Sequence, residues 1–518
     1  MNHRNTWIAC AAAASMLPWF ACAANATGNQ FNVKISTNAT RSVTFANGVF
    51  TPTADNANLN VTDLTNALAS GNIEVATGNS GEGTMDGDIH VAAGFTWASA
   101  NTLTLDAYHT IYIEQAVVDA GTGGLTLTTN DGGTDGQLTF QPTGSISFLG
   151  TSNALSIDGN TYTLANSVAA LASDIASNPS GYFALAGSYD ASKDGTYPGA
   201  PIGTTFMGTF EGLGNTISNL SISGTQVASL GLFLEIAEGG VIDSARLANV
   251  SIESNINLSS DTIGAVAADS TGTITATSVT GEISFAGEGG HDIGGLVGEN
   301  GGKISGASSS VAVQGPESHG QIFAGGLIGT NDGVVATSSA TGQVLIRGSF
   351  SAAGGLIGSN EGRVDESYAT GSVSCTNLSS AGGLIGESGG GNVANSYATG
   401  NVHCHHSAVG GFVGEAQKGH YFFSYSTGRP SDAIPPYAVG GFAELFTAGS
   451  AHAKHSYWDT TTSKTDNGTG DGNVAGITGL STLQLQSGLP NGFDPAIWAE
   501  NPSINNGFPY LIANPPPQ

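Results

Sequence analysis

Two acidic turns in the second half of the chain carry the side chains best suited to chemistry. Asp332 follows Asn331 in one turn, and Glu361 follows Asn360 in another, 29 residues later. Two carboxylates at a fixed separation can act as the acid and base of glycoside cleavage, and like charges held close together can share a cation or a proton. Further charged candidates follow the second turn: Arg363, Asp365 and Glu366. A solvated acidic face is the alternative interpretation of the same residues.

Two glycine-rich segments suggest calcium ligands. They are Asp131-Gly-Gly-Thr-Asp135-Gly and the segment from Asp466 to Asn473, which includes Asp471. Neither matches a complete EF-hand loop or a run of nine-residue calcium repeats, and isolated Asp-Gly pairs usually form turns alone. We therefore predict no cofactor and no metal at these positions, with calcium as the open alternative.

Cys375 and Cys404 are predicted to form a disulfide. They end two copies of one phrase and lie 29 residues apart. If the two copies stack at the strand spacing of a sheet, about 4.8 Å, their Cα atoms fall within the range that a disulfide tolerates. His403, His405 and His406 beside Cys404 suggest zinc, but adjacent residues of a strand face opposite sides and the disulfide removes the thiolate. A polar rim is the preferred interpretation of the histidines.

The element that must position these residues is a repeat of about 29 residues. A Gly-Gly phrase recurs six times with spacings of 31, 29, 28, 28 and 30 residues, beginning at Gly294, Gly325, Gly354, Gly382, Gly410 and Gly440. A second phrase, Ser-Tyr-Ala-Thr-Gly, recurs between them. The runs are short, β-branched and punctuated by glycine, which excludes helical repeats, and they are shorter than a propeller blade of roughly 40 residues. This period predicts an all-β, right-handed parallel β-helix with short capping helices.

Stacking turns the repeat into columns of equivalent residues. An apolar column predicts core, an amide column predicts a hydrogen-bonded ladder at a turn, and a tyrosine column is also interpreted as structural. The three columns are Leu296, Leu327, Leu356, Leu384, Phe412 and Phe442; Asn300, Asn331 and Asn360; and Tyr368, Tyr397, Tyr425 and Tyr457.

The amino-acid composition limits the classes of partner that the protein can bind. The 518 residues hold 12 Lys and Arg against 40 Asp and Glu, and 77 glycines. Because no basic stripe can neutralise phosphates, nucleic acid is excluded as a partner. Residues 1–26 read as a secretory signal peptide, with an apolar stretch from Trp7 to Phe20 and small residues after it. No later segment approaches the roughly 18 apolar residues of a membrane span.

The region before the repeats has a different sequence pattern. Residues 27–205 contain strand-like alternation and two predicted helices, one over residues 63–70 after a Thr62 cap and one carrying Leu164 to Ile175 before Pro179. Residues 206–460 hold the repeats, and residues 461–518 are expected to cover the last coil with Trp498, Pro502, Phe508 and Tyr510. About 490 mature residues predict 17 to 20 coils in a rod roughly 80 to 95 Å long.

The phrases resemble a known family. The run Phe206-Met-Gly-Thr-Phe-Glu-Gly-Leu-Gly, the later Gly-Gly-Leu-Ile-Gly and the Ser-Tyr-Ala-Thr-Gly copies resemble the GLUG-repeat region of filamentous-haemagglutinin-like bacterial surface proteins. The segment from Leu59 to Leu164 is similar to the passenger of the same exoproteins. Their dedicated secretion domain has no obvious copy before Leu59, which favours a short secreted or surface-attached relative.

The sequence therefore predicts a non-enzymatic, adhesin-like β-helix, secreted or associated with the outer membrane surface. Its expected partners are surface glycans or proteins, met through multivalent contacts, and a monomer is expected. A carbohydrate-active β-helix enzyme and a structural piece of a larger exoprotein remain the alternatives.

Overall fold

The structure is a computed structural model. It describes residues 30–78, 83–150, 152–224, 229–254, 260–286, 290–318, 320–348, 351–377, 379–432 and 439–517. The predicted signal peptide, residues 1–26, lies outside the described residues.

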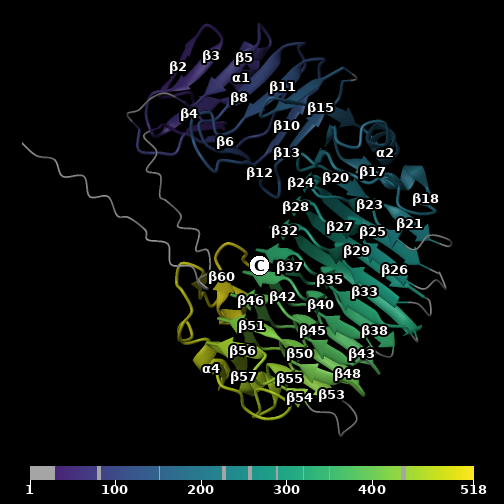
Figure 1. Cartoon of the computed structure of the whole chain (residues 1–518). Coiled ribbons are helices and arrows are strands. Elements are labelled where there is room, and N and C mark those ends of the chain that lie inside the picture. Colours follow the sequence, from purple (N-terminus) through teal and green to yellow (C-terminus); the bar gives the residue numbers. More distant parts are fainter. Residues whose placement is uncertain are drawn as a thin grey trace, which may run out of the picture.

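The chain forms a parallel β-helix of about 13 turns, which confirms the predicted fold class. Figure 1 shows it as a curved molecule with two arms, an N-terminal arm in purple and a longer C-terminal arm running from teal to green. The prediction of 17 to 20 coils in a rod is wrong. Residues 160–180 form a hairpin strand and a helix, and the last 40 or so residues run along the flank, so neither segment adds coils.

The last three coils of the N-terminal arm have three strands each, one in each of walls A, B and C, whereas the earlier coils have strands in walls A and C only. Within each wall, successive coils pair in parallel. Wall A contains β4 (Ala57–Asn60), β1 (Val33–Ser36), β6 (Ile89–Val91), β9 (Ile111–Ile113) and β12 (Leu138–Phe140); wall B contains β7 (Phe95–Trp97), β10 (Ala116–Asp119) and β13 (Ser145–Phe148); wall C contains β3 (Val49–Pro52), β5 (Ile73–Ala76), β8 (Thr102–Asp106), β11 (Gly124–Thr128) and β14 (Ala154–Ile157), with β2 (Val43–Ala46) antiparallel to β3.

Each coil of the C-terminal arm passes through four walls, numbered 1 to 4. Wall 1 contains β22 (Ser229–Leu230), β26 (Ser260–Gly264), β30 (Gly290–Gly294), β34 (Ile322–Gly325), β39 (Ala352–Gly354), β44 (Ser380–Gly382), β49 (Ala408–Gly410) and β54 (Val439–Gly440); wall 2 contains β23 (Phe233–Ile236), β27 (Ala267–Ser270), β31 (Val297–Asn300), β35 (Ile328–Asn331), β40 (Ile357–Asn360), β45 (Ile385–Ser388), β50 (Val413–Ala416) and β55 (Ala443–Phe446).

Walls 3 and 4 complete the coil. Wall 3 contains β16 (Tyr182–Leu185), β19 (Thr209–Glu211), β24 (Val241–Asp243), β28 (Thr273–Thr275), β32 (Lys303–Ser305), β36 (Val334–Ala336), β41 (Arg363–Asp365), β46 (Asn392–Ala394), β51 (Gly419–Phe422) and β56 (Ala451–Lys454); wall 4 includes β25 (Arg246–Ser254), β29 (Ser278–Phe285), β33 (Ser308–Ser318), β37 (Ser339–Ala340), β38 (Val344–Gly348), β42 (Tyr368–Ala369), β43 (Val373–Thr376), β47 (Tyr397–Ala398), β48 (Val402–His405), β52 (Tyr425–Ser426), β53 (Pro430–Asp432) and β57 (Ser456–Asp459).

The Gly-Gly phrase marks the corner between walls 1 and 2. A Cβ on Gly325 would lie 2.0 Å from the carbonyl oxygen of Ile328, and one on Gly326 would lie 2.3 Å from the carbonyl oxygen of Gly355 in the next coil. Real Cβ atoms do not approach backbone so closely, so only glycine lets the corner turn tightly and stack. The period of the phrase is therefore a steric requirement of the coil.

The predicted columns lie where stacking puts them. All six members of the leucine and phenylalanine column are fully buried. The Asn331 amide donates to the Asn360 carbonyl oxygen at 2.8 Å and accepts from the Asn300 amide at 2.7 Å, which confirms the predicted ladder. The rings of Tyr368 and Tyr397 stack 4.8 Å apart.

The tyrosine column faces away from the main core and is covered by the C-terminal segment. Its cover consists of Leu485, Phe493, Trp498, Phe508 and Leu511. Residues 467–470 bond to the last coil at its wall 1 to wall 2 corner, and β58 (Ile477–Leu480) pairs in parallel with β57 of the same coil. Residues 467–480 thus lie on the last coil, whereas Trp498 and Phe508 lie against the stacked tyrosines, because these offer a longer apolar strip along the flank.

Two helices lie at the ends of the arms' cores. Helix α1 (Val61–Leu68) begins at the N-cap Asn60 rather than at Thr62, and buries Leu64 and Leu68. Helix α2 (Val168–Ser177) begins after Ser167, so Leu164 belongs to the preceding strand, β15 (Asn160–Ala165). Short helices α3 (Thr460–Ser463) and α4 (Thr482–Leu485) lie in the C-terminal segment.

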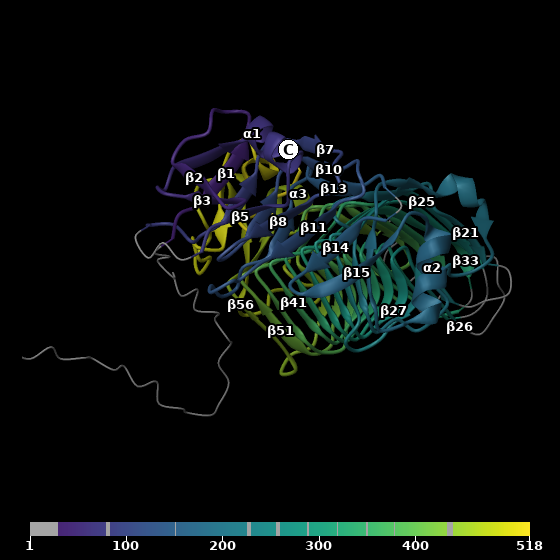
Figure 2. The ribbon, with the colours of Figure 1, turned by 90° about the horizontal axis from the view of Figure 1, so that it is seen from above.

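One continuous sheet joins the two arms. After β14 the chain reverses into β15, which pairs antiparallel with β14 and in parallel with β16. Wall C of the N-terminal arm therefore continues into wall 3 of the C-terminal arm. Figure 2 shows β8, β11, β14 and β15 following one another along this sheet. Leu164 and Ala184 pack with the N-terminal core, whereas Phe183, on the opposite face, packs with the C-terminal core. The face that lines the first core thus becomes the outer face of the second arm.

The asparagine ladder makes the first prediction. Replacing Asn331 with alanine leaves the Asn300 amide and the Asn360 carbonyl oxygen without their partner. Each unsatisfied buried group costs about 1 to 3 kcal/mol, so the free energy of unfolding, measured by denaturant titration, is expected to fall by that order. Asp332→Asn, in the adjacent exposed turn, is the matched control and should leave the midpoint unchanged. An equal midpoint for Asn331→Ala would contradict a ladder that stabilises the fold.

Candidate functional site

The acidic turns lie where stacking predicts, but their charges are not organised as a catalytic set. Asp332 and Glu361 occupy equivalent turns of neighbouring coils and are both exposed. The guanidinium of Arg363 donates to Asp365 at 2.6 Å within its own strand. Burial, and then the charge of Asp365, raise the pKa of Glu366. The geometry fits a solvated acidic face better than a paired acid and base.

The glycine-rich acidic segments form turns. The Asn130 side chain accepts from the Gly136 amide at 2.5 Å and donates to the Gly136 carbonyl at 2.7 Å, which closes the loop that contains Asp131 and Asp135. Asn473 accepts from the Gly468 amide at 3.1 Å. Within the described ranges no group of three or more His, Cys, Asp or Glu residues could hold a metal ion.

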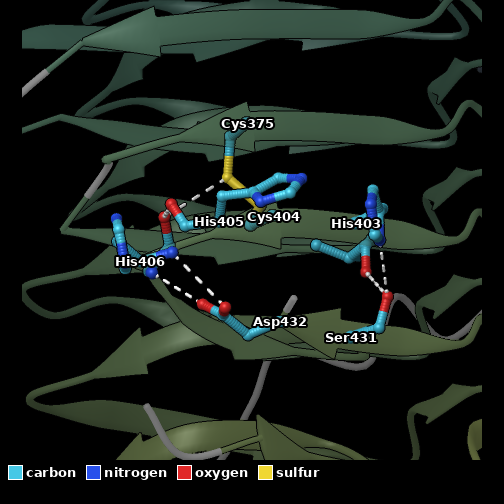
Figure 3. Close-up of a disulfide and its surroundings, with 9 residues drawn as sticks. Cys375, His403, Cys404, His405, His406, Ser431 and Asp432 are labelled. Atoms are coloured by element: carbon cyan, nitrogen blue, oxygen red, sulfur yellow. Dashed lines mark hydrogen bonds between the residues drawn. A yellow bond between two sulfur atoms is a disulfide. The ribbon is translucent and has the colours of Figure 1, made fainter. Parts of the chain in front are cut away.

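Cys375 and Cys404 form a disulfide between neighbouring coils of wall 4. They are register partners with a Cα separation of 4.4 Å, and both side chains point into the core. Figure 3 shows the three histidines around them. His403 is exposed and bonds Ser431 at 3.0 Å, and the ring of His406 bonds Asn377 at 3.2 Å. The thiolate that a zinc site would need is occupied in the disulfide.

A cleft of about 610 Å³ lies between the two arms. One side is the outer face of wall 3, from Thr209 to Thr337, and the other is the N-terminal arm around Phe140 and the β14–β15 turn. It opens at the point where the shared sheet leaves the first core. Arg246, beside the cleft, donates to the carbonyls of Gln141 at 2.8 Å and Pro142 at 3.0 Å, and so ties the arms together.

Two carboxyl groups stand side by side in this cleft. Leu164, Ala184, Glu211 and Asp243 are successive register partners on one face of the sheet. Leu164 and Ala184 pack against the N-terminal core. Glu211 and Asp243 lie beyond the edge of that core. Glu211 is only 6% exposed and accepts from the Leu213 amide at 3.0 Å through one oxygen. Burial, and then the charge of Asp243, raise the pKa of Glu211 well above its usual value.

The remaining walls of the cleft are polar and aromatic. Burial raises the pKa of Asp243. Burial, and then Glu211, raise the pKa of Tyr162, whose ring lies 5.4 Å from that of Tyr182. Lys303, Thr275 and Ser305 continue the lining along wall 3. The arrangement offers hydroxyls, carboxyls that tend to keep their protons, and an aromatic ring.

Sequence reasoning missed these residues. Glu211 and Asp243 precede the clear Gly-Gly copies, so no phrase marks them as one coil apart. The signal that could have found them is the pair of short strands Thr-Phe-Glu and Val-Ile-Asp, each ending in an outward-facing acid. The cleft also depends on the antiparallel turn after β14, and no repeated phrase in the sequence predicts that turn.

Comparison with known proteins agrees with the repeat phrase. The model of the GLUG motif matches residues 351–374 and 377–402. Halomucin of Haloquadratum walsbyi is 40% identical over 108 residues, which is 21% of this chain and 1% of halomucin. A solved structure described as a "putative immunoglobulin A1 protease" from Bacteroides ovatus superposes with a TM-score of 0.36 and 16% identity, covering 68% of this chain and 92% of that one.

The described part of the chain has no helix with the length and apolarity that crossing a membrane requires.

The disulfide makes the second prediction. It closes a loop with a sequence separation of 29, which stabilises a fold by about 3 kcal/mol on the chain-entropy model. Cys375→Ser combined with Cys404→Ser should lower the free energy of unfolding by that order. Dithiothreitol should lower the wild-type unfolding midpoint and leave that of the double variant unchanged. A wild-type midpoint that does not respond to the reductant would contradict a stabilising bridge.

The buried acid pair makes the third prediction. Because the folded pKa of Glu211 lies above its usual 4.5, the folded state holds this proton more tightly than the unfolded chain does. The corresponding stability is fully present below the unfolded pKa and is lost as pH rises through the folded pKa. Glu211→Gln should therefore gain stability relative to wild type as pH rises above 4.5, in denaturant titrations from pH 4 to 9. A constant difference across this range would contradict the raised pKa.

Proposed function

We propose that the protein is an extracellular attachment protein of the adhesin type, without enzymatic activity, whose ligand occupies the cleft between the two arms. The cleft is the observation that carries the proposal. Its volume lies within the range of roughly 300 to 1,000 Å³ that is usual for ligand sites. It also lies on a rigid, stacked scaffold, which suits a site that must hold its shape under load.

The chemistry of the chain supports an extracellular location. Disulfides persist in oxidising compartments, and the Cys375–Cys404 bridge joins two coils. The GLUG motif and the similarity to part of halomucin agree with the resemblance to large surface proteins. The net charge of −28 keeps such a surface soluble and repels nucleic acid.

The proposed ligand site is the cleft, and not the repeated side chains of the coils that the sequence suggested. The leucine, asparagine and tyrosine columns are buried, so these repeated side chains are not available to a ligand. Multivalent attachment would then come from several copies of the protein on one surface, each with one weak site.

A carbohydrate-active enzyme is the second candidate function. The observation that favours it is the pair Glu211 and Asp243, whose backbones lie one sheet spacing apart; carboxyls about 5 to 5.5 Å apart act together in retaining glycosidases. Incubation with a polysaccharide panel, with and without calcium, followed by assays for new reducing ends and unsaturated sugars, separates the two. Turnover that Asp243→Asn abolishes would favour the enzyme.

The fourth prediction tests the cleft as the attachment site. Ser305 lines the cleft from wall 3, and Ser305→Trp should fill it and reduce binding of the immobilised protein to cells, glycans or matrix proteins at least tenfold. Asn392→Trp is the matched control, because it places the same ring on an exposed position of wall 3 beyond the cleft. Equal binding by both variants would place the attachment site elsewhere.

A further inference from the structure

We propose that the cleft binds an uncharged saccharide chain, with Tyr162 against the face of a sugar ring and Glu211 and Asp243 hydrogen-bonded to its hydroxyl groups. This inference rests on the proposed function and names the class of ligand that the same site would take.

The first support is a buried polar group that faces the cleft without a full set of partners. Glu211 is more than nine-tenths buried, and one of its oxygens accepts from the Leu213 amide. Among the residues that the structure describes, its other oxygen has no hydrogen bond. That oxygen is not among the fully enclosed atoms that lack a partner, so it is open to the cleft, where a ligand hydroxyl can form a hydrogen bond with it.

The second support is the pairing of hydrogen-bonding groups. Two neighbouring carboxyls that disfavour ionisation present both O–H donors and carbonyl acceptors. A sugar hydroxyl also donates and accepts, so the two sets match. Thr275 and Ser305 add hydroxyls along the same wall. Four successive coils contribute, from Glu211 to Ser305, which gives a lined length of about 14 Å at the sheet spacing.

The third support is the aromatic ring. Tyr162 lines the cleft together with Glu211 and Asp243. A ring next to polar groups presents an apolar face and a polar tip, which suits the C–H face of a sugar. Asp332 and Glu361, in their exposed turns, lack such a ring.

Charge argues against an acidic saccharide. Asp243 on β24 is the charged neighbour of Glu211. Asp158 and Tyr182 lie around Tyr162 with these two acids, and Lys303 on β32 lines the same cleft. Lys303 is the only Lys or Arg among the described lining residues, which include three acids, Asp158, Glu211 and Asp243. A ligand carboxylate would meet net repulsion there, and would raise the cost of ionising Glu211 further.

The test, the fifth prediction, measures binding of the full secreted chain to neutral polysaccharides (a mannan, dextran and a mixed β-glucan) and to acidic ones (polygalacturonate and hyaluronate) by affinity electrophoresis and calorimetry. We expect a neutral polymer to bind at pH 5, and its affinity to fall as pH rises and Glu211 loses its proton. Glu211→Ala should weaken binding at least tenfold. Glu211→Gln, which keeps a donor and an acceptor, should retain binding and flatten its pH dependence.

Controls keep the outcomes distinct. Asp332→Asn combined with Glu361→Gln should bind as wild type does, and circular dichroism with unfolding midpoints shows whether each variant folds. If Glu211→Ala does not fold, Ser305→Trp replaces it as the variant that removes binding. A preference for acidic polymers, or neutral-polymer binding that survives both Glu211→Ala and Ser305→Trp, overturns the inference. Attachment to a protein ligand that Ser305→Trp abolishes overturns it while the proposed function stands.

Discussion

The close approach of successive coils at the Gly-Gly corner is the constraint on which the rest of the structure depends. A side chain at Gly325 or Gly326 would collide with a backbone carbonyl of its own or the next coil. Once the corners stack, every other residue of the coil is placed above its equivalent. The buried leucines, the asparagine ladder, the tyrosine stack and the disulfide all follow from this one register.

The site arises where that regular stacking is interrupted. The turn from β14 into antiparallel β15 reverses the chain, and the next core forms on the other face of the same sheet. Leu164 and Ala184 still face the first core, but Glu211 and Asp243 lie beyond it. Acids that are largely buried cannot be fully hydrated, and this is why burial raises the pKa values of Glu211 and Asp243. The cleft is thus a consequence of joining two solenoids with opposite inner faces.

Most of the fold could be predicted from the repeat, whereas the cleft and its acidic residues could not. Leu327 and Leu356 recur with the glycine phrase, so their shared column and the Cys375–Cys404 pairing could be worked out from spacing alone. Glu211 could not be found in that way, because its role depends on the β14–β15 turn and on the N-terminal arm, which are unique in the sequence. The position of Trp498 was missed for a related reason. In the sequence Trp498 resembles a cap, but it packs on the tyrosine stack. The spacing alone does not show that this stack faces away from the main core.

The most direct measurement is a crystal structure of the protein with a neutral oligosaccharide. The account predicts the sugar in the cleft, with a ring against Tyr162 and a hydroxyl within hydrogen-bonding distance of Glu211, on the sheet face that Leu164 and Ala184 share. An oligosaccharide bound to the acidic turns at Asp332 and Glu361, or a structure in which Glu211 does not continue the Leu164 and Ala184 column, would contradict it.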